Sequence, residues 1–188
     1  MSKKMIGKLM LGIWAILVLP IFSYQLANIL PLTNFNLSDI GNEYGYRIEF
    51  IVWGIGVTIY FIMMVYLFLK HFKMKRGYYL ALVFAGFGMS TAILIPYFPN
   101  DNSFLAGRHI DLAMFGLTCL LGMFFGFLMQ LSLLKIKYMK WMQGIFCGIL
   151  LLTFLIYSQY GMINSLLEIV FVSLFSIYLY SFYLLYIP

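Results

Sequence analysis

Three ionisable residues that lie close together in the sequence, Arg108, His109 and Asp111, have a clear capacity for chemistry. They follow a proline-rich stretch at residues 95–101. On a helix, Arg108 and Asp111 are three positions apart and can pair on one face, whereas His109 points about 100° away from Arg108. We interpret the three as a structural ion pair and a histidine at the membrane interface. A ligand or proton site is the alternative, because ionisable groups near membrane depth are costly and often functional.

Two glutamates extend this set. Glu49 opens one apolar segment, and Glu168 lies about one turn inside another, where leucine, isoleucine and valine flank it. An ionised carboxylate in such surroundings requires a cation or water, and Arg47 or Arg108 are the arginines expected on the same side of the membrane. We hypothesise that one outward-facing polar pocket brings together Glu49, Arg108, His109, Asp111 and Glu168 as ligand-binding residues.

The elements that must position these residues follow from the composition. Of 188 residues, 64% are hydrophobic and 10% charged, against about half and about a quarter in soluble domains. This excess must face lipid, where a helix needs about 20 apolar residues to cross. The sequence therefore predicts an all-α polytopic membrane protein, a six-helix bundle forming one transmembrane domain over residues 1–188. The spans are expected near residues 7–29, 48–69, 78–98, 110–134, 141–159 and 164–186.

The charges predict an orientation for these spans. Ten of the twelve basic residues fall in three segments, namely Lys3, Lys4, Lys8, Lys70, Lys73, Lys75, Arg76, Lys135, Lys137 and Lys140. Because Lys and Arg are retained on the cytoplasmic side, both termini are expected in the cytoplasm. The connections near residues 30–47, 99–109 and 160–163 are expected outside, as the acidic residues also indicate.

Two features bear on helix packing. We expect Pro20 to kink the first span, which we interpret as an uncleaved helix in preference to a signal peptide. Two Gly-x-x-x-Gly patterns, Gly122 with Gly126 and Gly144 with Gly148, allow close helix approach. They fit packing within the bundle or a homo-oligomer equally well.

Several classes of chemistry find no support in the sequence. It contains no nucleophile elbow, nucleotide-binding loop or metalloprotease motif, so we assign no catalytic residue. One histidine with carboxylates is a weak basis for a metal site, and we expect no metal and no cofactor. The positive net charge of +6 follows from membrane topology, so a nucleic-acid partner is rejected.

The stretch IPYFPND followed by GRHIDLAMFG carries a family resemblance. A proline-rich end of the third span, a short outward loop and a histidine that opens the fourth span resemble the bacterial domain-of-unknown-function 998 family, which is similar to the Frag/DRAM type of six-span membrane proteins. The motif residues are Phe98, Pro99, Asp101, Gly107, His109 and Ala113. The resemblance implies six spans and a motif position at His109, and it brings no activity.

Taken together, these features favour a multi-pass protein of a bacterial plasma membrane. We expect a non-catalytic accessory or binding protein whose outward pocket takes a lipid headgroup, a peptide or a small ion. Membrane lipids are the expected partners. The alternatives are a lipid-modifying enzyme, with His109 as general base oriented by Asp111 or Glu168, and a small transporter with Glu168 as its coupling site.

Overall fold

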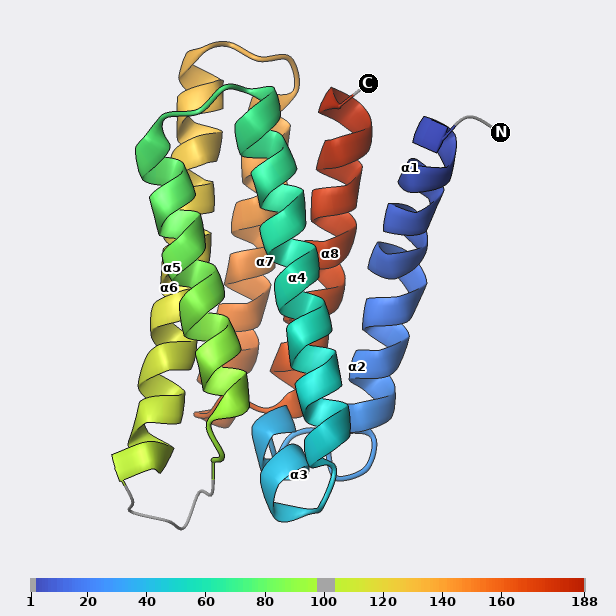
Figure 1. Ribbon diagram of the computed structural model, residues 1–188, viewed down its shortest axis with the longest axis vertical. Helices are drawn as coiled ribbons and strands as arrows, with labels where there is room; N and C mark the ends of the chain where they lie inside the picture. Colours follow the sequence, from blue (N-terminus) through green and yellow to red (C-terminus); the bar gives the residue numbers. More distant parts are fainter. Residues whose placement is uncertain (1–2, 98–103, 188) are drawn as a thin grey trace.

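Six long apolar segments run side by side in the computed structural model, which describes residues 3–97 and 104–187 (Figure 1). The first is composite: α1 (Lys3–Ile13), the π-helical turn η1 (Trp14–Val18) and α2 (Leu19–Ala27) follow one another. The others are α4 (Arg47–His71), α5 (Arg76–Leu94), α6 (Phe104–Leu133), α7 (Met139–Tyr160) and α8 (Ser165–Tyr186). Within the described ranges, these six are long and apolar enough to cross a membrane. The predicted all-helical class and number of spans are confirmed.

The end of α5 and the start of α6 differ from the predicted boundaries of the third and fourth spans. α5 ends at Leu94 rather than at 98, and Ile95 is extended with φ −77° and ψ 124°, because the following Pro96 excludes its neighbour from the helical region. α6 begins at Phe104 instead of 110, since a helix continues into the polar interface beyond the apolar stretch that hydropathy detects. The motif positions Phe98, Pro99 and Asp101 lie outside the described residues.

The disturbance expected at Pro20 is a π-helical turn directly before it. Pro20 has no N–H to donate to the preceding turn, and the backbone widens over Trp14–Val18 so that the Leu19 N–H bonds to the carbonyl of Trp14. Such single π turns are a common way to accommodate an irregularity within a helix.

The connection predicted as a loop at residues 30–47 contains a further helix, α3 (Leu37–Glu43). Its start is fixed by a capping box, in which the Asn36 side chain accepts from the Asp39 N–H and Asp39 accepts from the Asn36 N–H. α3 packs on α4 so closely that a Cβ at Gly41 would lie 2.6 Å from the Cβ of Phe50. Hydropathy does not reveal this helix, because its seven residues are too few to form a spanning segment.

Both ends of the described chain lie at the same end of the bundle, together with the α4–α5 and α6–α7 connections (Figure 1). We call this the basic end, since it gathers the three lysine-rich segments, and the opposite end the α3 end. Towards the basic end, aromatic rings from four helices fill the interior, with ring centroids 4.7–6.5 Å apart among Phe68, Phe124, Phe127, Phe146, Phe175 and Phe182.

The closest helix approach joins α5 and α6 at a pair of glycines. A Cβ at Gly88 would lie 2.9 Å from the Cα of Gly116, and a Cβ at Gly116 would lie 2.6 Å from the Met89 nitrogen. The Gly-x-x-x-Gly patterns make no such contact: Gly122, Gly144 and Gly148 face open space, and Gly126 has only Tyr78 at ordinary distance. Close packing within the bundle therefore depends on other glycines than those patterns.

Candidate binding cavity

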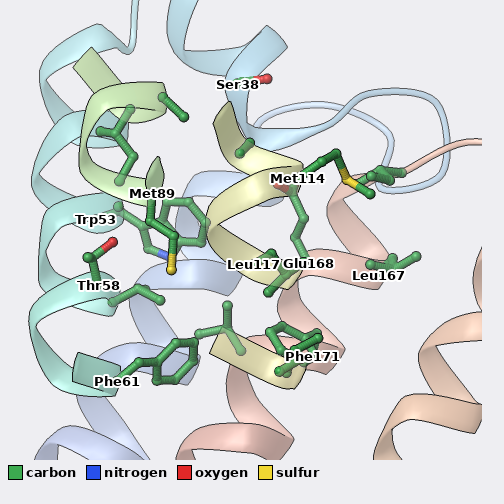
Figure 2. A pocket seen from close by; sticks show the side chains of 18 of the residues that line it. Ser38, Trp53, Thr58, Phe61, Met89, Met114, Leu117, Leu167, Glu168 and Phe171 are labelled. Carbon is green, nitrogen blue, oxygen red and sulfur yellow. The ribbon is translucent and has the colours of Figure 1, made fainter. Parts of the chain in front are cut away.

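A cavity of about 270 Å³ occupies the interior towards the α3 end. Figure 2 shows Ser38 of α3 at one end of it and Phe61 and Phe171 at the other. Its walls come from α4, α5, α6, α7 and α8 and are mostly apolar, including Phe50, Trp53, Val57, Met89, Ile93, Ala113, Met114, Leu117, Leu150 and Val172. Five lining residues are polar: Ser38, Thr58, His109, Thr153 and Glu168. An apolar cavity with a few polar groups is the usual form of a small-molecule site.

Glu168 lines this cavity and satisfies the start of α3. Its Oε2 accepts from the Leu37 N–H at 2.7 Å, one of the helix N–H groups that have no partner within the helix. Neither Arg47 nor Arg108, the arginines expected on this side, pairs with Glu168 in the described residues. The sequence could not show this, because the donor is a backbone group 131 residues away.

The start of α8 is bound to the connection that carries α3. Asn164 caps α8 by accepting from the Leu167 N–H, and its amide donates to the Thr33 carbonyl at 3.3 Å. The N–H and hydroxyl of Ser165 both donate to the Phe35 carbonyl, at 2.7 and 2.8 Å. These bonds fix the first turn of α8, which carries Glu168, against the residues that precede α3.

His109 lies at the junction of α5 and α6 and is 7% exposed. Its Nδ1 lies 2.8 Å from the Ala92 carbonyl oxygen and 3.1 Å from that of Ile95, so Nδ1 carries the proton and donates to the last carbonyls of α5. The Tyr97 ring stacks on it at 5.0 Å. His109 therefore closes the end of α5, and neither Asp111 nor Glu168 orients its ring.

The other predicted site residues lie apart from the cavity. Arg108 and Asp111 form the expected i,i+3 pair at 3.2 Å, with both side chains exposed, and Glu49 is exposed on α4. Arg47 donates to the Asn42 side chain and the Leu94 carbonyl. Of the five residues of the hypothesised pocket, the structure brings His109 and Glu168 together and leaves Glu49, Arg108 and Asp111 outside.

Three buried polar atoms in the described residues have no hydrogen-bond partner, and sequence reasoning did not identify them: Asp39 Oδ1, Thr58 Oγ1 and the Tyr178 hydroxyl. The Thr58 hydroxyl is buried in a residue only 4% exposed, on the cavity wall of α4, and no described group bonds to it. Asp39 is 5% exposed, and its Oδ1 is likewise unpaired. The spacing of Asn36 and Asp39 is a capping signal that could have revealed α3 and hence Asp39; no sequence signal distinguishes Thr58.

Burial also affects the acid–base behaviour of the α3 end. Loss of solvent raises the pKa of Asp39, partly opposed by its bonds with Asn36 and reinforced by the charge of Glu43. The pKa of Tyr97 is raised too, first by burial and then by Asp39 and Glu43. Burial therefore favours the neutral forms of both groups, and the neighbouring carboxyls act in the same direction.

The arrangement fits binding better than it fits the other chemistry we considered. Among the described residues, no group of three or more His, Cys, Asp and Glu side chains could hold a metal ion. The chain matches no family model, no curated protein and no solved structure. The geometry of the site is that of a half-open, mostly apolar cavity whose lining includes the Glu168 carboxylate.

Proposed function

We propose that this integral membrane protein is a non-catalytic binding protein that holds the apolar part of a lipid-like ligand in the cavity, with the ligand's polar end towards α3. The observation that carries the proposal is the cavity itself. Its volume of about 270 Å³ is just below the range of about 300–1,000 Å³ for small-molecule pockets, and apart from five polar residues its lining is apolar. The site we propose is therefore less polar than the pocket hypothesised from the sequence.

The basic end is proposed to face the cytoplasm of a bacterial plasma membrane, which places the cavity in the outer half of the bilayer. The support is the gathering of ten of the twelve basic residues in segments at one end. Lys75→Cys and Glu43→Cys, each made alone in a Cys119→Ala, Cys147→Ala background, test this with a membrane-impermeant maleimide on intact cells. Labelling is expected at position 43 and not at 75, and the reverse pattern would refute the orientation.

A photoactivatable alkyl alcohol tests the binding proposal. Ala113 lines the cavity, whereas Thr118 is exposed on the same helix. The probe is a diazirine analogue of dodecanol, applied to the protein in nanodiscs, and the readout is labelling of the peptides that line the cavity. Ala113→Phe fills the cavity and is expected to abolish this labelling, whereas Thr118→Phe is expected to leave it unchanged. Equal labelling of wild type and Ala113→Phe would show that the cavity is not the site.

The transporter alternative keeps one specific observation in its favour. Glu168 is a carboxylate inside a candidate span and lines a cavity, and such residues mark ion and substrate pathways in membrane proteins. Uptake or efflux of a cavity ligand by proteoliposomes, lost in Glu168→Gln, would favour transport over simple binding. The enzyme alternative has less support, because no carboxylate orients His109.

A further inference from the structure

We propose that the ligand of the cavity is a hydrophobic cation: an amphiphile whose protonated amine or quaternary ammonium lies against Glu168, with its alkyl or aromatic part in the cavity. This inference rests on the proposed binding function and specifies its ligand class.

The charge balance at the α3 end is negative. Glu168 and Asp39 interact electrostatically, and Glu43 adds a third carboxyl close to Asp39. Among the described residues the one ion pair is Arg108 with Asp111, which therefore leaves these three carboxyls unpaired. Arg47 is the nearby cation, and its guanidinium is engaged by Asn42 and the Leu94 carbonyl and lies 5.9 Å from the centre of the Phe50 ring.

The structural role of Glu168 does not account for its charge. Its bond to the Leu37 N–H uses one oxygen, Oε2, and a glutamine would accept that bond equally well without the desolvation cost of a carboxylate. No described group donates to the other oxygen, and the residue lines the cavity. A carboxylate inside a membrane span is stabilised by a cationic partner, and Oε1 is free to accept one.

The cavity wall suits a cation with an apolar body. Phe50, Trp53, Phe61 and Phe171 are part of the lining, and aromatic faces attract ammonium groups within about 6 Å of the ring centre. Trp53 is held in place by donating from its indole nitrogen to the Ser23 hydroxyl at 2.8 Å. An alkyl anion would instead meet the Glu168 carboxylate, so the proposed site discriminates by charge as well as by shape.

Thr58 gives independent support for a missing partner at this site. Its hydroxyl is buried on the cavity wall of α4 with no described partner, and Figure 2 shows it on the same side of the cavity as Trp53 and Met89. Buried polar groups are nearly always hydrogen-bonded. In this conformation the hydroxyl itself is shielded from the cavity, so Thr58 marks an incomplete hydrogen-bonding environment next to the site.

Competition against the photoactivatable alcohol tests the proposal in nanodiscs of phosphatidylcholine. The competitors are dodecylamine, dodecyltrimethylammonium, dodecanol and dodecanoate, which share one chain and differ in headgroup. The two cations are expected to compete about tenfold more strongly than dodecanol. Dodecylamine donates a charge-assisted hydrogen bond to Glu168, whereas dodecyltrimethylammonium, which has no N–H, is attracted by the carboxylate charge and the aromatic rings. Dodecanoate is expected to compete least.

Two conservative variants localise the selectivity. Glu168→Gln keeps the acceptor for Leu37 and is expected to reduce the preference for cations to about twofold or less, while Glu49→Gln, which removes an exposed carboxylate on α4, leaves it unchanged. Asp39→Asn leaves the cavity wall intact and is expected to weaken the preference partly, which provides a second measurement if Glu168→Gln fails to fold.

The outcomes separate the two proposals. Equal competition by dodecanol and the cations, with binding still abolished by Ala113→Phe, overturns the cation inference and leaves the binding function standing. Failure of every competitor overturns both. A cation preference that Glu49→Gln removes and Glu168→Gln does not would assign the effect to surface charge and overturn the inference.

Discussion

Replacing Gly116 by alanine tests the contact that holds α5 against α6. An added Cβ would lie 2.6 Å from the Met89 nitrogen and 3.0 Å from the Ala85 carbonyl oxygen, both backbone atoms, and ordinary contact begins at 3.4 Å. The helices must therefore separate locally by about 0.8 Å. Overpacking of this kind costs about 1–3 kcal/mol, and the better helix propensity of alanine recovers up to about 1 kcal/mol. We expect a net loss of about 1–2 kcal/mol.

For a chain of this length each kcal/mol corresponds to about 2–4 °C, so Gly116→Ala should lower the apparent Tm by roughly 2–8 °C. The assay is loss of the monodisperse peak after heating in detergent, followed by size-exclusion chromatography. Gly122→Ala is the matched control, because Gly122 lies on the same helix with nothing within 4 Å. If the apparent Tm of Gly116→Ala equals or exceeds that of Gly122→Ala, the close approach of α5 and α6 does not determine stability.

Three further substitutions have defined outcomes. Asp39→Asn should remove a pH dependence: the raised pKa of Asp39 means that the fold favours the protonated acid, so wild-type Tm relative to the variant should fall as pH increases from 3.8 through the raised pKa. A flat difference would contradict this. His109→Ala should cost about 1–3 kcal/mol, because it leaves buried carbonyls at the end of α5 without a donor, whereas His71→Ala, exposed at the basic end, should not change Tm. Asn164→Ala should cost about 0.5–2 kcal/mol through loss of the α8 cap, and an unchanged Tm would show that the cap is dispensable.

The sequence predicted the helices well because lipid imposes a strong constraint on composition. Every spanning segment must satisfy its backbone internally and be apolar over about 20 residues, and this pattern is visible without any knowledge of contacts. The errors in the predicted elements lie where the hydropathy of the sequence carries no information about structure. α3 has only seven residues, and the end of α5 depends on Pro96 more than on the apolar stretch that continues past it.

The candidate site was predicted only in part, for a related reason. His109 and Glu168 were singled out because ionisable residues in apolar surroundings are conspicuous, and both line the cavity. Their partners were not predictable, because those partners are backbone groups at helix ends: the Leu37 N–H and the carbonyls of Ala92 and Ile95. Any residue type provides such groups, so sequence alone does not identify them.

The bonds between the first connection and α8 have a consequence for biogenesis. The Leu37 N–H is bonded by a carboxylate 131 residues later in the chain. Synthesis of these residues takes about 7–26 s at ordinary rates of translation. At the opposite end, the Lys8 ammonium likewise donates to the Ile187 carbonyl. The first segment can therefore pack on α4 early, through the bond from Trp53 to Ser23, whereas its contacts with α8 form only when the chain is nearly complete.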